Sequence, residues 1–466
     1  MGLAILVLKI YNTLTKQKQP FQPIEPGKVG LYVCGVTVYD YCHIGHARTY
    51  LAFDVVVRFL RWQGYQVHYV RNITDIDDKI IKRANENQQA TDDLVMRFTE
   101  IMRQEFDSLG ILPPDQEPKA TETIAEMQAM IQILIDKGFA YLADNGDVYY
   151  SVEKFPSYGK LSGQHIHQLR SGQRVEVNVD KKDPLDFVLW KAAKPDEPKW
   201  DSPWGPGRPG WHIECSAMTK QCLGAQFDIH AGGSDLRFPH HENEVAQSEA
   251  ANGCHFANYW MHSGMVRINQ QKMSKSLGNF FIIHDVLQQY APEVVRYFLI
   301  SAHYRSELNY SDENLKAAKA SLTKLYLALR DLPVADRVAD SDYQARFIAA
   351  MHDDFNTPEA LAVLFDLAHH INRLRTDNLQ AAAQYGALLK YLAEVLGLLQ
   401  QAPETFLSER VDDQSKQAAE SDQLIAERQQ ARADKDWTRA DQIRDRLDQL
   451  GVVVEDGNHG TRWRYR

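Results

Sequence analysis

The chain has 466 residues, a formal net charge of −10 and five cysteines. Its length predicts two to four domains, because domains usually contain roughly 100 to 200 residues. The acidic balance excludes a uniformly basic surface for non-specific nucleic-acid binding, although a local basic patch can still contact phosphates. Because the cysteines are odd in number and few for this length, we expect free or metal-bound thiols in a reducing compartment.

The N-terminal segment MGLAILVLKIYNTLT is apolar, but it does not have the pattern of a signal peptide. It lacks a charged region and a small-residue cleavage site, and Lys9 interrupts the apolar run well short of a membrane span. We therefore expect a first buried strand here, in a cytoplasmic and monomeric protein that does not associate with membranes.

The first clear unit has the pattern of a strand, a helix and a second strand. An apolar run from Val29 to Cys34 ends at Gly35, a helical pattern runs to the stop at Gly64, and a second apolar run begins at Val67. This pattern predicts a βαβ unit in a parallel, Rossmann-like α/β domain. Its ligand is expected beyond the C-terminal end of the first strand.

The rest of the chain divides into segments of different character. A region rich in Pro and Gly, about Leu112 to Pro209, is predicted to be an insertion, because βαβ patterning resumes with FDIHAGGSDL. Within it, Asn145 and Gly146 predict a hairpin turn. From Ser311 the pattern is helical almost to residue 400. The predicted units are an α/β domain (1–310), a helical bundle (311–410) and a small C-terminal module (411–466) whose polar linker spans about 411–421.

Two motifs suit the binding of phosphates. In CHIGHAR, His43 and His46 stand immediately before a helix, whose N-terminus attracts anions. In QKMSKSLGN, within the region 265–310, Lys272 and Lys275 could neutralise the charge on a departing pyrophosphate. Each motif alone is more often a pair of loop histidines or a solvated lysine loop. Together, in this order on a βαβ unit, they resemble the class I aminoacyl-tRNA synthetases.

A candidate metal site follows from the segment FPHHENE. On a helix, His240 and Glu244 share one face, although a surface hydrogen bond is the simpler alternative. The zincin pattern fails, because Val245 stands where a second histidine is required. With Cys34 and Cys215, the pair would make a zinc set of two thiolates, an imidazole and a carboxylate.

The segments YVCGVTVYD, GWHIECSAM and FPHHENE together resemble the cysteinyl branch of that family, and the resemblance extends over essentially the whole chain. It implies that ATP, with Mg²⁺ on its triphosphate, and L-cysteine form an adenylate whose acyl group passes to tRNA-Cys. It also implies that Zn²⁺ selects the substrate thiol. A site that rejects an analogue lacking the required ligand needs no editing domain.

The resemblance further implies roles for single residues, each of which has packing or a surface salt bridge as its alternative. Thr74 and Trp211 would line the amino-acid pocket, and Gly232, Gly233 and Asp235 would bind the adenosine together with His43, His46 and Lys275. Anticodon contacts would come from Arg432, Trp437, Asp441 and Asp456. His241 and Glu242 are expected to be supporting or surface groups, and Cys42, Cys222 and Cys254 are expected to have no metal role.

Two alternatives remain from the sequence. A related ligase that joins cysteine to an amino sugar would share the nucleotide and zinc motifs but would not need the residues after Ser311. A non-catalytic RNA-binding relative would not need the lysine loop. The intact motifs and the long C-terminal part favour the synthetase over both.

Overall fold

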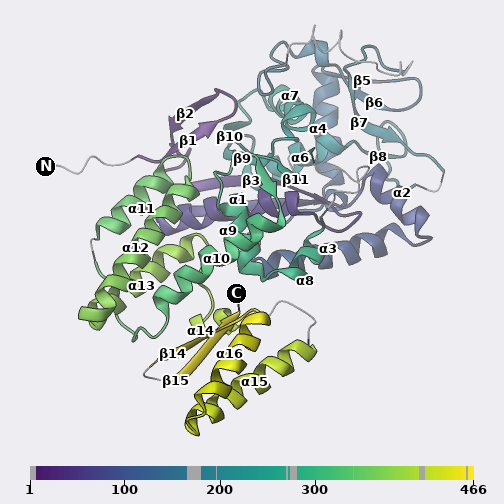
Figure 1. Ribbon diagram of the computed structural model, residues 1–466. Helices are drawn as coiled ribbons and strands as arrows, with labels where there is room; N and C mark the ends of the chain where they lie inside the picture. Colours follow the sequence, from purple (N-terminus) through teal and green to yellow (C-terminus); the bar gives the residue numbers. More distant parts are fainter. Residues whose placement is uncertain are drawn as a thin grey trace, which may run out of the picture.

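The structure is a computed structural model that describes residues 7–164, 180–195, 197–268, 271–272, 281–339, 341–408, 415–457 and 460–465. At its centre lies a four-stranded parallel sheet in the order β10-β9-β3-β4 (Figure 1). The strands are β3 (Lys28–Thr37), β4 (Gln66–Thr74), β9 (Phe227–Gly233) and β10 (Ala257–Ser263). This sheet confirms the predicted α/β class.

Helix α1 (Ile44–Trp62) connects β3 to β4 and forms the predicted βαβ unit. Apolar residues on several of its faces, including Phe53, Val56 and Leu60, are fully buried. They are buried all round because the sheet covers one side of the helix and helices α9 (Pro292–Ile300) and α13 (Leu379–Val395) contact it elsewhere. The helix ends just before Gly64, whose φ of 91° favours glycine.

Between β4 and β9 the chain forms a second unit. This unit lies at the upper right of Figure 1. Its antiparallel sheet has the order β5-β6-β7-β8, and the pairing of β5 with β6 confirms the predicted hairpin. It also has a hydrophobic core of its own. The elements from β4 to this sheet are α2 (Asp78–Glu86), α3 (Thr91–Ser108), a 3-10 turn (Ala120–Glu122), α4 (Ile124–Asp136), β5 (Ala140–Leu142), β6 (Val148–Tyr150), a second 3-10 turn (Val152–Lys154), β7 (Phe187–Ala192) and β8 (Gly207–Pro209).

The chain then returns to the central sheet, adds β9 and β10 to it, and continues into helices. Helix α6 (Trp211–Leu223) precedes β9, and a π-helical turn (Arg237–His241) leads into α7 (Glu242–Asn252) before β10. A small sheet of β11 (Val266–Ile268), β12 (Gln271–Lys272) and β13 (Leu308–Tyr310) follows. The remaining helices of this part are α8 (Ile283–Gln289), α10 (Asp312–Leu329), α11 (Asp342–His352), α12 (Thr357–Asp377) and α14 (Pro403–Ser408).

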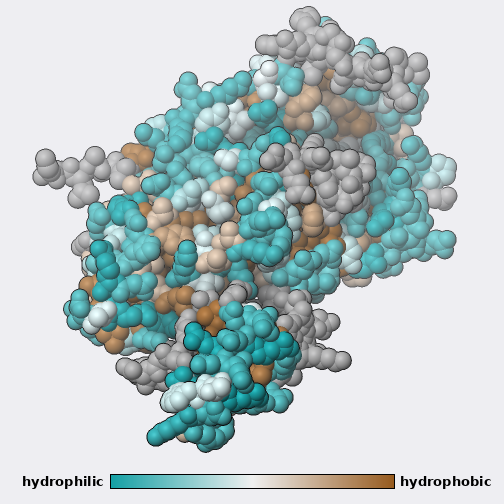
Figure 2. Space-filling view, viewed as in Figure 1, coloured by the Kyte–Doolittle hydropathy of each residue, from teal (hydrophilic) through white to brown (hydrophobic). Residues whose placement is uncertain are grey.

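The C-terminal module consists of α15 (Ser415–Ala433), α16 (Trp437–Gln449) and the hairpin of β14 (Val452–Gly457) and β15 (Gly460–Tyr465). The predicted linker 411–421 is wrong from Ser415 onward, because α15 begins there. Helix α15 is mostly polar, but a narrow apolar stripe on it contributes to a small core. This core consists of Ile425, Ile443, Leu447 and Val452. The exposed face of this module is largely hydrophilic in Figure 2.

The N-terminal part of the described chain forms a short hairpin of β1 (Lys9–Asn12) and β2 (Gln17–Pro20). Ile10 is buried as the sequence predicted, but the strand forms a two-stranded sheet with β2, with a further bridge from Lys9 to Asp353, and is not a strand of the central sheet. Among the described residues, no helix has both the length and the apolar character that crossing a membrane requires.

Candidate active site

A cleft of about 410 Å³ opens at the C-terminal ends of β3, β9 and β10. This is the edge of a parallel α/β sheet at which ligands usually bind. Its lining includes residues from the loop after β3, the start of α1, the end of β9 and the segment after β10. Among them are Cys34, His43, His46, Trp211, Gly233, Asp235, Gly264, Met265 and Val266.

His43 and His46 lie together at the start of α1. Their rings stack with centroids 3.6 Å apart, and each ring Nδ1 accepts a hydrogen bond of 3.2 Å from the other residue's backbone N–H. The N–H of Ile44 is also used, because it donates to the carbonyl of Phe281. The helix start therefore offers fewer available N–H groups than the sequence suggested, and the stacked imidazoles themselves face the cleft.

The lysine loop is anchored to the site at both ends. Before it, Lys272 in β12 pairs with Arg267 in β11. After it, Ile282 bridges to His43, and the N–H of Ile283 donates to the carbonyl of Cys42. Lys275 lies outside the described residues. Backbone hydrogen bonds therefore join the residues that follow the lysine motif to the histidine motif, although the two motifs are more than 220 residues apart in the sequence.

The end of β9 carries the predicted adenosine residues. Gly233 and Asp235 line the cleft, and a Cβ on Gly233 would lie 2.4 Å from Asp235 Oδ1. Gly232 is under a different constraint, because a Cβ there would lie 2.8 Å from Cε1 of His241. Glycine at 232 thus lets the imidazole of His241 approach the strand closely.

The structure brings Cys34, Cys215, His240 and Glu244 together, with their ligand atoms all within 4.8 Å of one another. The two sulfurs are 3.9 Å apart, and Cys34 Sγ lies 3.5 Å from Glu244 Oε1. His240 Nε2 lies 3.1 Å from the same oxygen. All four side chains are buried, the most exposed being Cys34 at 3%. This excludes the alternative of a surface hydrogen bond between His240 and Glu244.

Local structure explains how these side chains converge. Cys34 lies where the pairing of β3 with β4 is irregular, and the adjacent Gly35 permits it, since a Cβ there would lie 1.5 Å from the carbonyl oxygen of Asn72. Cys215 lies on α6 four residues after Trp211, whose ring stacks on His240 with centroids 4.2 Å apart. His240 itself belongs to the π-helical turn before α7, so the helix begins later than the sequence predicted.

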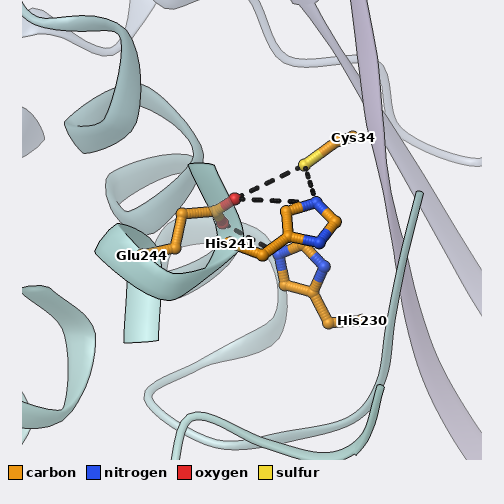
Figure 3. A group of neighbouring side chains, drawn as sticks. All are labelled: Cys34, His230, His241 and Glu244. Carbon is orange, nitrogen blue, oxygen red and sulfur yellow. Dashed lines mark hydrogen bonds and ion pairs between the residues drawn. The ribbon is translucent and has the colours of Figure 1, made fainter. Parts of the chain in front are cut away.

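A second group shares two of these ligands. Cys34, His230, His241 and Glu244 also lie within 4.8 Å of one another, and Figure 3 shows both imidazoles beside the carboxylate. His230 Nε2 lies 2.8 Å from Glu244 Oε2, and His241 Nε2 lies 3.2 Å from Cys34 Sγ. His241 Nδ1 is bonded to His262 at 2.8 Å. His230 was missed from the sequence, where only its place in the strand FDIHAGG could have indicated it.

His241 and Glu242 are fully buried, which excludes the surface alternative and leaves the expectation that they are supporting groups. The carboxylate of Glu242 accepts hydrogen bonds of 2.9 and 2.7 Å from the N–H groups of Gly159 and Ser162. It therefore holds the segment that follows Tyr158 against the start of α7. Glu242 therefore borders the candidate ligand group from the side of the inserted unit, whereas His241 contacts Cys34 and His262 of the central sheet.

Burial sets the protonation of the candidate ligands. It raises the pKa of the Cys34 thiol well above its usual value, and neighbouring Cys215 and Glu244 add to this effect. It lowers the pKa of His240 well below its usual value, so that this imidazole is neutral and has a lone pair to give. The buried thiols need a nearby cation in order to ionise, and the neutral imidazole can donate its lone pair. This donor set therefore suits a divalent metal.

The remaining predicted residues lie in two places. Thr74 ends β4, is 2% exposed and accepts a hydrogen bond of 3.3 Å from Asn72 Nδ2, while Trp211 lines the cleft. In the C-terminal module, Trp437 is 57% exposed and the guanidinium of Arg432 lies 5.9 Å from the centre of its ring. Asp441 is exposed on the same helix as Trp437. The backbone of Asp456 lies in β14, but its side chain is outside the described part.

Comparison with protein families gives three matches that follow one another along the chain. Residues 20–320 match the model of the tRNA synthetase class I (C) catalytic domain. Residues 346–400 match the DALR domain, and residues 416–464 match the cysteinyl-tRNA ligase anticodon binding domain.

Similar proteins and structures agree with these matches. A cysteine–tRNA ligase of Vibrio atlanticus is 58% identical over 98% of this chain and all of its own, and one of Methylococcus capsulatus is 57% identical with the same coverage. A Mycobacterium tuberculosis methionyl-tRNA synthetase has the same fold, with a TM-score of 0.56 at 16% identity over 79% of this chain and 89% of its own. The resemblance found in the sequence is therefore confirmed, and the chain belongs to the cysteine–tRNA ligase family of class I aminoacyl-tRNA synthetases.

Proposed function

We propose that this protein activates L-cysteine with ATP and transfers it to tRNA-Cys. In the first step a carboxylate oxygen of cysteine attacks the α-phosphorus of ATP, which gives cysteinyl adenylate and releases pyrophosphate. In the second, the 2′-hydroxyl of the terminal adenosine attacks the acyl carbon and AMP leaves. The observation that carries the proposal is the buried group of two thiols, an imidazole and a carboxylate beside a nucleotide-sized cleft.

We propose Cys34, Cys215, His240 and Glu244 as the zinc ligands. Two sulfurs with one imidazole and one carboxylate suit zinc better than the alternative set, which has a single sulfur. His230 then orients Glu244 through its other oxygen, and Trp211 holds the plane of His240. Zinc, when bound, supplies a Lewis acid that prefers a thiolate to an alcohol and so favours cysteine over serine.

Catalysis in this proposal rests on positioning and charge, with no side chain as nucleophile. His43 and His46 bind phosphate oxygens from the start of α1, and Lys272 and Lys275 neutralise the departing pyrophosphate, with Mg²⁺ on the triphosphate. Gly232, Gly233 and Asp235 form the end of β9 that receives the adenosine. Thr74 and Trp211 complete the pocket for the amino acid.

The tRNA would contact the helices and the C-terminal module. We propose the catalytic domain as 1–310 with its insertion at 112–209, the stem-contacting bundle as 311–410 and the anticodon module as 411–466. Arg432 and Trp437 suit this role, because a guanidinium beside an exposed indole can stack on and bond to splayed bases. Asp441 and Asp456 would accept hydrogen bonds from base edges. A monomer in the cytoplasm is part of the same proposal.

The match of residues 416–464 to an anticodon binding domain weighs against a ligase that uses an amino sugar. Cysteine-dependent exchange between ATP and pyrophosphate, measured beside a charging assay with tRNA-Cys, tests the proposal. We expect exchange without tRNA and charging with it. Exchange without charging of any tRNA would favour the amino-sugar ligase, and the absence of both would favour a non-catalytic relative.

A further inference from the structure

Arg48 lies on α1 two residues after His46 and is only 1% exposed. Burial lowers its pKa to about 10, so the side chain is still charged at neutral pH. Its guanidinium donates hydrogen bonds to backbone carbonyls in the segment 299–306, which leaves the C-terminus of α9. The acceptors are Leu299, Ala302 at 3.3 Å, His303 at 2.6 Å and Ser306 at 3.4 Å.

These bonds add to few other contacts of this backbone, in which the His303 carbonyl also accepts a hydrogen bond of 2.9 Å from the N–H of Ser306. The last carbonyl groups of a helix have no partner within it, and the carbonyl of Leu299, in the last turn of α9, is buried. A planar guanidinium can serve several acceptors at once, whereas a lysine ammonium has a different geometry and fewer donors. Arg48 therefore fixes the path of segment 299–306 on one side.

The helical part of the chain holds the same segment on its other side. Tyr304 Oη donates to Asp354 Oδ1 at 2.9 Å, and Arg305 Nε donates to Asp354 Oδ2 at 2.7 Å. Asp354 is fully buried between α11 and α12. Thr357 adds a hydrogen bond of 2.7 Å from its hydroxyl to the carbonyl of Ile300.

Segment 299–306 in turn supports one wall of the nucleotide cleft. The N–H of Gly264 donates to the carbonyl of Tyr304 at 2.8 Å, and a Cβ on Gly264 would lie 2.2 Å from Ser306 O. Gly264, Met265 and Val266 all line the cleft. Val266 also begins β11, which pairs with the strand that carries Lys272. Any shift of the segment would therefore move the wall and the base of the lysine loop.

We infer that Arg48, and Tyr304 through Asp354, are positioning residues for the activation step, because they fix segment 299–306 behind the Gly264–Val266 wall. The inference rests on the proposed function. Arg48 does not line the cleft in the described part of the chain, so it acts through the wall and not on ATP itself. The geometry also ties the helical bundle to the wall of the active site.

Arg48→Lys tests this inference, and Arg296→Lys is its matched control. Arg296 is equally buried and donates to the carbonyls of Leu396 at 2.8 Å and Gly110 at 2.9 Å and to the carboxylate of Asp54. Gly110 also accepts from Arg58, in the C-terminal half of α1 and so away from His46. The full-length protein is assayed for exchange, zinc content and thermal unfolding. We expect Arg48→Lys to lower kcat for exchange about ten- to hundred-fold, since a displacement of about 1 Å can cost this much.

Zinc content and the KM for cysteine should change less than about two-fold in Arg48→Lys, because the metal-ligand group lies on other elements. Arg296→Lys should lose stability but keep kcat within about three-fold. Equal kcat values for the two variants would overturn the inference. An inactive wild-type protein would instead contradict the proposed function, so the two failures are distinguishable.

A second pair of variants tests the inference even if Arg48→Lys fails to fold. Tyr304→Phe removes only the hydroxyl bonded to Asp354, and Tyr326→Phe removes a similar buried hydroxyl bonded to Glu293 at 2.6 Å, away from the cleft. We expect Tyr304→Phe to lower kcat for exchange about three- to ten-fold, less than Arg48→Lys, because it removes a single buried hydrogen bond. Equal kcat values for the two tyrosine variants would contradict the role of Asp354.

Discussion

His240 and His241 are adjacent in the sequence but have different neighbours, and each could serve as a metal ligand. His240 approaches Glu244 Oε1 at 3.1 Å and lies near Cys215 in one candidate group, whereas His241 approaches Cys34 at 3.2 Å and is bonded to His262. We expect His240→Ala to lose zinc and cysteine binding but to keep ATP binding. Zinc content by metal analysis and ligand binding by calorimetry provide the measurements.

The matched control is His241→Ala, which removes an imidazole of the same burial from the other group. We expect it to weaken zinc binding by about 10- to 100-fold at most, as for residues that orient metal ligands. If His241→Ala loses the metal while His240→Ala retains it, the ligands are those of Figure 3. Glu244→Gln should be milder than His240→Ala, because an amide oxygen can still approach the metal.

Sequence spacing could predict that His240 and Glu244 share a face, since that depends only on local geometry. It could not predict His230, whose position depends on the pairing of β9 with β3, where Tyr32 is opposite His230. The register between strands nearly 200 residues apart is set by long-range packing. Nor could it predict that Gly232 leaves room for His241.

At the scale of elements, α3 carries a buried carboxyl that we expect to make stability depend on pH. Glu105 is 6% exposed, and burial raises its pKa to about 7, although the N–H of His284 partly opposes this. In the unfolded chain a glutamate ionises near pH 4.3. The unfolded state therefore releases this proton first as pH rises, and the free energy of unfolding falls between about pH 4.3 and 7.

Glu105→Gln removes this titration and should stabilise the protein by about 1 to 3 kcal/mol at pH 8, with little difference at pH 4.5. Urea unfolding at both pH values measures the effect. Glu100→Gln, which changes an exposed glutamate on the same helix, is the control. Parallel pH profiles for the wild type and Glu105→Gln would show that Glu105 ionises as an ordinary glutamate.

Elements with a strong local pattern could be predicted, and those held by weak or distant contacts could not. The βαβ unit has a continuous apolar strand, a helix buried all round and a glycine stop, all of which are visible in the sequence. Helix α15 was mistaken for linker at its start because it is polar and buries only a narrow stripe. The π-helical turn before α7 has no signal in the sequence beyond its proline.

At the scale of the whole molecule, the C-terminal module has a core separate from that of the catalytic part. Ile425, Ile443, Leu447 and Val452 form this core, and α14 precedes it, with Phe406 stacked on Tyr326 at 4.1 Å. Figure 1 shows the module below the helices and away from the central sheet. Ending the chain after Ser408 therefore removes one core, together with the contact of β15 with α14, and retains the contact of α14 with α10.

We expect the protein truncated after Ser408 to keep its kcat for exchange within about two-fold, because no residue that lines the cleft is removed. Charging should fall by at least about ten-fold in kcat/KM, equivalent to about 1.4 kcal/mol of lost tRNA binding. Steady-state assays of both reactions on the truncated and full-length proteins provide the test. Equal charging would contradict the proposed anticodon role of Arg432 and Trp437. A matching loss of exchange would mean that the module supports the catalytic part through α14, and Phe406→Ala in the full-length chain should then lower exchange as well.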